Sequence, residues 1–234
     1  MVPAARDLLA TWEQGQHRHP LDRALLLYAL ADPNAAPAGL ADRPLGQRNM
    51  ALLRLHRAMF GRRLRAALDC PDCVCELEIE LDVDGLCGAA EVPPAEVELT
   101  GRRFRVPTTR DLAAIAHQSD VDTAAEQLVQ LCRIVDPDRE GTTASLPRVE
   151  ELEAAWEDAD PNADIALDLA CSDCGHRWHA EFDVPAFVWT ELASYAVRLL
   201  DEVHLLAGAY GWNESEILAL SDVRRAAYIE RAIA

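Results

Sequence analysis

Apolar residues recur with helical spacing over most of the chain. Residues 21–30 (LDRALLLYAL) predict a short apolar helix that ends before Asp32-Pro33. Residues 31–46 are rich in proline and glycine and predict a loop. A longer helix is predicted from about residue 47 to residue 68, with apolar and arginine side chains on different faces, although Gly61 weakens its centre.

Two stretches in the middle of the chain alternate between apolar and polar residues, which is the period of a strand with one solvated face. They are residues 77–84 (LEIELDVD) and residues 97–106 (VELTGRRFRV), and the second is predicted to turn as a hairpin at Thr100-Gly101. Helical spacing then returns, and Thr108 with Asp111 forms a capping pattern. The later helices are predicted at residues 109–118, 122–135, 147–156 and 185–209, followed by two short helices capped by Asn213 and Ser221. The pattern predicts an α+β fold that is mainly helical, with a small β element.

Two Cys-x-x-Cys motifs stand far apart in the sequence. The segments that they open, residues 70–83 (CPDCVCELEIELDV) and 171–184 (CSDCGHRWHAEFDV), align without a gap and share six identical residues in register. A knuckle followed by an alternating strand is half of a zinc ribbon, and tetrahedral zinc accepts four thiolates. The repeat therefore predicts one structural zinc site in a discontinuous zinc ribbon, closed by both halves after a long insertion. The predicted ligands are Cys70, Cys73, Cys171 and Cys174.

Other interpretations of the cysteines remain open. The two motifs could be buried thiol pairs in a fold that has lost its metal, or a dithiol redox site. Redox motifs of this type open a helix, whereas an alternating strand follows here, so redox chemistry is the weakest interpretation. His176 and His179 could replace a ligand, but in a strand their side chains point to opposite faces. Cys75 is expected beside the site or in solvent, and Cys87 and Cys132 are expected to be packed thiols.

The motifs divide the chain into five predicted regions. In order, these are an N-terminal helical region (1–68), the first zinc-knuckle half with its strands (69–110), a helical insertion (111–162), the second zinc-knuckle half (163–186) and a C-terminal helical region (187–234).

The charge balance limits the partners. The net charge is −18 at pH 7, which argues against nonspecific nucleic-acid binding. A local exception is the basic N-terminal part, where Arg62, Arg63 and Arg65 could pair with the protein's own acids, with an acidic protein or with nucleic acid, the first being the usual outcome. No apolar run approaches the ~18 residues of a membrane span, and the N-terminus lacks a signal-peptide core. We therefore expect a cytoplasmic protein whose cysteines bind metal or remain thiols.

The sequence contains no recognisable catalytic motif. Glycine-rich phosphate loops, nucleophile elbows and the His-Glu-x-x-His pattern are all missing. We expect a protein that is not an enzyme.

The C-terminal segment carries a second recognisable pattern. It reads His204-Leu205-Leu206, Tyr210-Gly211-Trp212, Glu216-Ile217-Leu218 and Arg224-Arg225-x-x-Tyr228. With residues 52–73 (LLRLHRAMFGRRLRAALDCPDC) and the strand that follows, it resembles the baseplate-hub assembly chaperone family of T-even-like phages and its relatives in extracellular contractile injection systems. The resemblance covers about residues 48–85 and 165–231.

This resemblance implies a non-enzymatic role in building a baseplate, with baseplate, hub or tail proteins of a contractile particle as partners. It supplies no catalytic residues, and because family members do not all bear zinc, the zinc prediction depends on the cysteine spacing alone. Two alternatives remain. One is a stable structural subunit of the baseplate, and the other is a zinc-ribbon regulator that binds nucleic acid, which the acidic charge disfavours.

Overall fold

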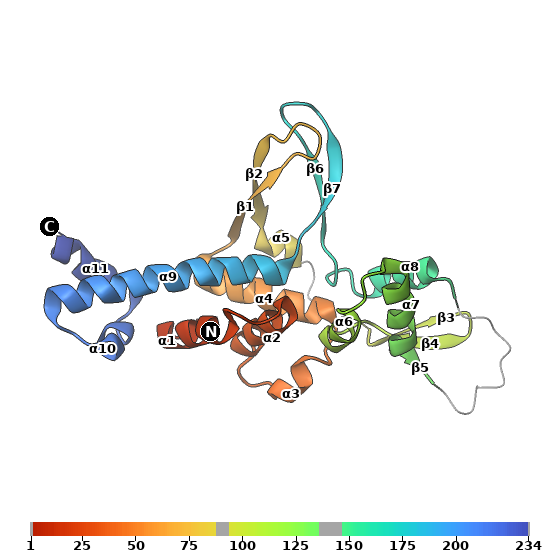
Figure 1. Ribbon diagram of the computed structural model, residues 1–234, viewed down its shortest axis with the longest axis horizontal. Coiled ribbons are helices and arrows are strands. Elements are labelled where there is room, and N and C mark those ends of the chain that lie inside the picture. The colour runs from red at the N-terminus through yellow and green to blue at the C-terminus, as the bar shows by residue number, and fades with distance from the viewer. Residues whose placement is uncertain (1, 88–93, 136–146, 234) are drawn as a thin grey trace.

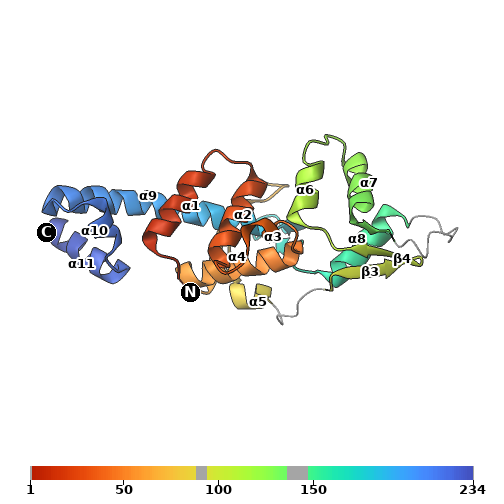
Figure 2. The same ribbon diagram turned by 90° about the horizontal axis from the view of Figure 1, so that it is seen from below.

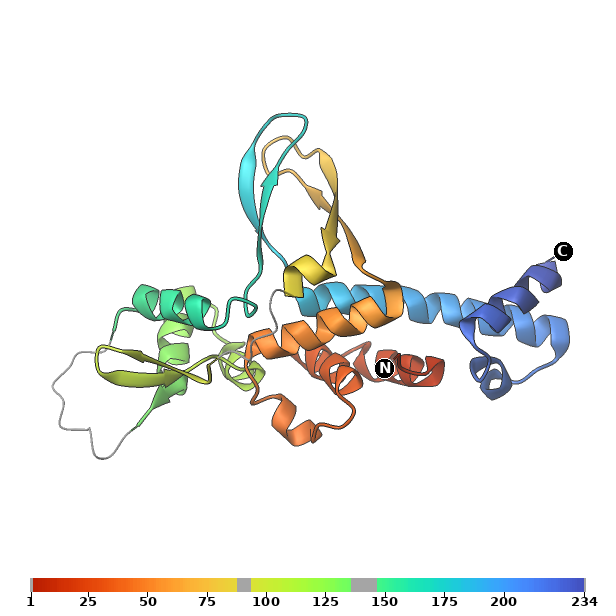
Figure 3. The same cartoon turned by 180° about the vertical axis from the view of Figure 1, so that it is seen from behind.

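The computed structural model describes residues 2–87, 94–135 and 147–233. The molecule is elongated, and the long helix α9 (Val184–Tyr210) follows its long axis (Figure 1). Two β-hairpins project together from one side of the helical body, near the N-terminal end of α9 (Figures 1 and 3). An insertion with its own small sheet lies at one end of the molecule, and the C-terminus lies at the other (Figure 2).

Helices make up most of the structure. In chain order they are α1 (Ala5–Gly15), α2 (Pro20–Ala31), α3 (Pro37–Leu40), α4 (Leu45–Phe60), α5 (Val83–Cys87), α6 (Thr109–Ile115), α7 (Val121–Cys132), α8 (Val149–Ala159), α9, α10 (Glu214–Leu218) and α11 (Asp222–Ile233).

The strands are short and antiparallel, and they form three separate sheets in the described part of the chain. The two projecting hairpins are two-stranded, and the insertion contains a three-stranded sheet in the order β3-β4-β5. The strands are β1 (Arg63–Asp69), β2 (Glu76–Asp82), β3 (Glu96–Leu99), β4 (Arg102–Arg105), β5 (Arg133–Ile134), β6 (Ala166–Ala170) and β7 (Arg177–Glu181). Helices with small sheets agree with the predicted α+β class.

The main core lies between the helices of the body and reaches the base of the first hairpin. Tyr28 of α2, Leu52 of α4 and Val188 of α9 are almost completely buried in one apolar cluster. Leu64 of β1 and Val83, directly after β2, belong to the same cluster. Burial of apolar side chains contributes roughly 1.5–3 kcal/mol each, so the hairpin base is anchored by the packing of the helical body.

Helix α4 ends at Phe60, so the prediction of one helix up to residue 68 is wrong. Gly61 has a φ of 96° and caps the helix, and β1 starts two residues later at Arg63. The alternation of buried and exposed positions in β1 matches its pairing with β2, which overrides the helical propensity of the segment. The predicted N-terminal region of residues 1–68 therefore ends on a strand.

The insertion has a core of its own, with Phe104, Cys132 and Leu152 fully buried. The predicted hairpin is confirmed, with positive φ values of 53° and 73° at Thr100 and Gly101. The predicted helix at 122–135 is three residues too long, because α7 ends at Cys132 and the chain continues as β5 against β4.

Buried polar contacts join the insertion to the body. The N–H of Gly46, in the first turn of α4, donates to Asp160 Oδ2 at 2.9 Å. Asn49 donates to the backbone carbonyls of Asn162 and Ala163 at 2.9 and 3.1 Å. Because α4 carries these donors, the insertion is positioned against the same helix that leads into the first hairpin.

Several local predictions are confirmed, and some helices were not predicted. The capping boxes at Thr108 and Asn213 both form. Helix α1 had not been predicted, and α3 lies within the segment predicted as a loop. None of the helices in the described ranges combines the length and the apolar character that crossing a membrane requires.

Candidate metal centre

The two knuckles have the same backbone structure, each at the tip of its hairpin. In the first, Cys70 N–H donates to Cys75 O, and the N–H of Val74 donates to Cys70 O, both at 2.9 Å. In the second, Cys171 N–H donates to His176 O at 2.9 Å, and Gly175 N–H donates to Cys171 O at 3.0 Å. The sequence repeat is therefore also a repeat of hydrogen bonds.

A left-handed residue occupies the same position in both knuckles. Val74 has a φ of 58°, and Gly175, at the equivalent place, has a φ of 75°. Glycine adopts this conformation freely, whereas a β-branched residue is strained in it. The first knuckle therefore maintains a turn that its sequence disfavours locally.

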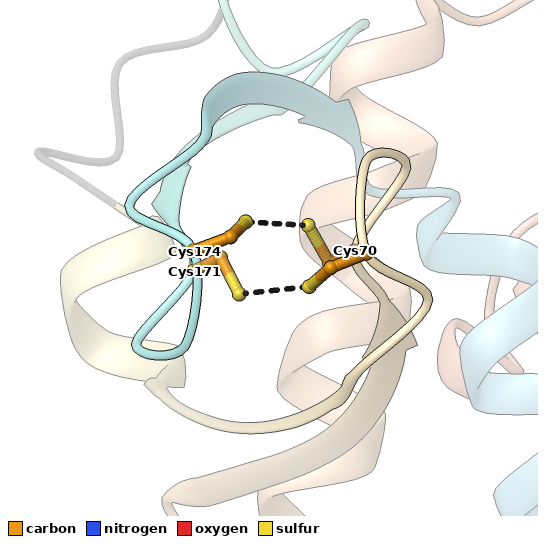
Figure 4. A group of neighbouring side chains, drawn as sticks. Cys70, Cys171 and Cys174 are labelled. Atoms are coloured by element: carbon orange, nitrogen blue, oxygen red, sulfur yellow. Dashed lines mark hydrogen bonds between the residues drawn. The ribbon is translucent and has the colours of Figure 1, made fainter.

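The two hairpin tips bring the four predicted cysteines together (Figure 4). All four Sγ atoms lie within 4.8 Å of one another. The Sγ atoms of Cys70 and Cys174 are 3.7 Å apart, and those of Cys73 and Cys171 are 3.6 Å apart. A disulfide requires about 2.05 Å. Zn–S bonds of about 2.3 Å in a tetrahedron separate the sulfur atoms by roughly 3.8 Å, so the group has the size of a four-thiolate metal site.

The protonation of the cluster favours a bound cation. Backbone N–H groups of Cys174 and Asp173 favour the thiolate of Cys171 and lower its pKa to about 7. The backbone N–H of His176 acts in the same direction on Cys174, but desolvation and the neighbouring sulfur atoms outweigh it and raise the pKa of Cys174 to about 12. The thiol of Cys174 therefore resists ionisation beside its sulfur neighbours, and a divalent cation would supply the positive charge that favours its thiolate.

The two histidines behind the second motif lie outside this group. His179 Nδ1 lies 2.6 Å from Asp168 Oδ1 on the exposed face of the hairpin. His176 stacks on Trp178 at a centroid distance of 5.9 Å. Within the described ranges, the four cysteines are the one group of possible metal ligands at coordination distances, and no histidine belongs to it.

The remaining cysteines do not belong to the four-sulfur group, although Cys75 lies beside it, as expected, and interacts with Asp173 of the second knuckle. Cys75 Sγ lies 3.5 Å from the carbonyl oxygen of Glu76. Cys87 ends α5 and is half-buried. Cys132 is buried in the insertion core, and burial raises its pKa to about 12, so the prediction of a packed thiol is confirmed there.

The arginines around the first hairpin pair with its own acids. Arg62 forms ion pairs with Asp82 and Asp84 at 2.6 and 3.1 Å, and Arg63 and Arg65 both pair with Glu80. These residues follow α4 or lie on β1, not on a helix as predicted. The interpretation that they pair within the protein is confirmed.

A second feature lies at the far end of α9, where three aromatic rings meet. Tyr210 stacks on Trp212 at 4.8 Å, and Trp212 meets Tyr228 edge-on at 4.8 Å. Arg225, which is 2% exposed, joins α11 to α9 through an ion pair with Glu202 at 2.6 Å. The residues of the C-terminal sequence pattern thus form one packed unit.

No family model, curated protein or solved structure gives a significant match to this chain.

Proposed function

We propose that this protein is a non-enzymatic zinc protein that helps to assemble the baseplate of a phage-tail-like contractile injection particle, or is a minor component of it. The observation that carries the zinc part is the tetrahedron-sized group of four sulfur atoms at the hairpin tips. The contractile-particle part derives from the sequence resemblance described above.

The donor set supports a structural metal. Four cysteine ligands fill a tetrahedral site and leave no open position for water or substrate, as in structural zinc sites and unlike catalytic ones. Thiolates in a tetrahedron suit zinc or iron. Zinc is preferred because the site is built from two knuckle-and-hairpin halves, the arrangement of a zinc ribbon.

The metal would bind the tips of two hairpins that are separate sheets. In the described structure, no strand of β1-β2 pairs with a strand of β6-β7. A shared ion would therefore replace the missing backbone hydrogen bonds between them and turn two hairpins into one projecting arm. An isolated two-stranded hairpin is marginally stable, so this link has a large effect on the arm.

Exposed aromatic and apolar side chains at the other end of the molecule support a docking role. Tyr210, a member of the ring cluster, is 37% exposed, and Val223, on the same helix as Tyr228, is 80% exposed. Aromatic residues of this type are enriched in protein interfaces. The acidic charge and the internal pairing of Arg62, Arg63 and Arg65 disfavour the nucleic-acid alternative.

Two measurements test the proposal. Elemental analysis of the purified protein should find about one zinc per chain and no stoichiometric iron. The tagged protein, expressed with the sheath, tube and baseplate genes of its own locus, should recover hub or tail proteins. Its absence from finished particles would assign it to assembly, whereas its presence would favour the structural-subunit alternative. A locus without tail genes, or failure to recover any tail protein, would refute the contractile-particle role while leaving the zinc result intact.

A further inference from the structure

A pocket of about 370 Å³ lies on the helical body, away from the cysteine cluster. It is formed where the N-terminal ends of α2 and α9 approach α4 and α6. Leu112, Phe182 and Trp189 contribute apolar walls, and Arg23 and Arg48 contribute positive charge.

Arg48 is buried without a counter-ion. It is only 5% exposed, and its Nε and Nη2 donate to Asn49 Oδ1 at 3.2 and 3.0 Å while its Nη1 donates to Thr109 Oγ1 at 3.0 Å. No carboxylate in the described part of the chain forms an ion pair with it. A guanidinium has five N–H donors, so two remain available. Desolvation lowers the pKa of Arg48 to about 10, which reflects the unfavourable environment of this charge.

Arg23 adds a second guanidinium of the same kind. Its Nε and Nη2 donate to the backbone carbonyls of Gly15 and Gln16 at 2.9 and 2.6 Å, and it lies 5.0 Å from the ring centroid of Trp189. These partners are neutral, and Arg23 forms no ion pair with any of the described residues. Two arginines that form no direct ion pair with any of the described residues therefore line one pocket.

The other charges around the pocket limit its ligand. Asp164, Glu181 and Asp183 also line it, but all three are exposed to solvent, and Asp183 already accepts a hydrogen bond from Ala186 N–H at 3.0 Å. The negative charge of Asp183 raises the pKa of Arg48 and so partly offsets the effect of desolvation. These acids would repel a dianion such as phosphate more strongly than a single negative charge, and the apolar walls favour an organic group.

We propose that this pocket binds a monocarboxylate, with the carboxylate at Arg48 and Arg23 and an apolar body against Trp189. Guanidinium groups bind carboxylates through two parallel hydrogen bonds, and the bound anion would supply the counter-ion that Arg48 lacks. The carboxylate could belong to a small organic acid or to the free C-terminus of a peptide chain, because both present the same group. This site is independent of the zinc centre and of the contractile-particle role.

The test compares acids with their uncharged amides on the full-length protein as purified. Benzoate and benzamide represent small molecules, and acetyl-Ala-Ala-Phe with a free or an amidated C-terminus represents a peptide end. Thermal shift and calorimetric titration should detect the acids, with a dissociation constant of about 1 mM or lower for the better one, and at least tenfold weaker binding of its amide. Tighter binding of benzoate identifies a small organic acid as the ligand class, and tighter binding of the peptide acid identifies a chain terminus.

Matched variants place the binding in the pocket. Arg48→Met should weaken binding of the preferred acid at least tenfold, whereas Arg54→Met, the same change at an exposed position of α4, should leave it unchanged. If Arg48→Met does not fold, the acid and amide pairs on the unmodified protein still decide, because each pair keeps the apolar body and replaces only the carboxylate by an uncharged group. Equal binding of acid and amide, or no binding of either acid, would overturn the proposal.

Discussion

Replacing Cys73 with serine removes one sulfur from the group that joins the two hairpin tips. The connection between the knuckles closes a loop of roughly 100 residues, and a covalent cross-link of that length restricts the unfolded chain by about 4.7 kcal/mol. A metal held by two ligands from each hairpin restricts the chain in a similar way. Because domains are stable by about 5–15 kcal/mol, loss of the metal would remove a large part of the total.

The loss of stability on removal of the metal corresponds to a measurable change in melting temperature. For a protein of this size, 1 kcal/mol corresponds to about 2–4 °C, so Cys73→Ser should lower Tm by roughly 9–19 °C and abolish stoichiometric zinc. Circular dichroism gives Tm, and elemental analysis of the same sample gives the metal content. The reasoning would be refuted by a Cys73→Ser protein that loses its zinc but melts with the unmodified protein.

Cys75→Ser is the matched control for this experiment. Cys75 lies two residues after Cys73 in the same knuckle, and its Sγ is outside the four-sulfur group. It should retain its zinc and a Tm within about 2 °C of the unmodified protein, since the change is conservative and Cys75 is not one of the four clustered cysteines. A Cys75→Ser variant that loses zinc as Cys73→Ser does would show that the ligand set is different.

The remaining predictions concern backbone and buried polar groups, and each is checked by chemical or thermal unfolding. Gly175→Val should cost about 1–2 kcal/mol because φ is 75° there, whereas Val74→Gly should relieve strain and not destabilise. Gly46→Ala should destabilise by about 1–3 kcal/mol, because a Cβ there would lie 1.8 Å from Asp160 Oδ1. Burial raises the pKa of Asp160 above its ordinary 3.8, so the folded protein binds a proton at this carboxyl more tightly than the unfolded chain does. The free energy of unfolding therefore falls as pH rises from 3.8 through the higher pKa of the folded state. Asp160→Asn keeps an oxygen acceptor for Gly46 N–H and should remove this fall in stability above pH 3.8; an unchanged pH profile would contradict this assignment.

The cysteine cluster was predictable because its signal is chemical and repeated. Two knuckles with the same spacing, each followed by an alternating strand, demand the same turn twice and leave few ways to use four thiols. The helix caps at Thr108 and Asn213 were predictable for a similar reason, since a capping box is specified by two side chains three positions apart. Local chemistry of this kind does not depend on how the rest of the chain packs.

One wrong prediction and one omission arose where packing decides the outcome. Residues 63–69 have helical as well as alternating spacing, and only pairing with the acidic strand β2, through contacts such as Arg63 with Glu80, selects the strand. The burial of Arg48 and Asn49 had not been predicted. They are buried because the insertion packs on α4 at that point, and no local pattern in the sequence indicates this contact.

The connections of the hairpins link the metal site to the packing of the body. β1 follows α4 after Gly61, and β7 leads into α9 through Asp183, whose side chain caps that helix. Because α4 and α9 pack directly on each other, their relative position sets the distance between the two hairpin bases and hence between the knuckles. Four sulfur atoms can share one ion only when these helices are docked correctly. Metal affinity should therefore report on the folding of the helical body as well as on the knuckles themselves. A core substitution such as Leu52→Ala, in α4 and outside both knuckles, should weaken zinc binding in proportion to the stability that it removes.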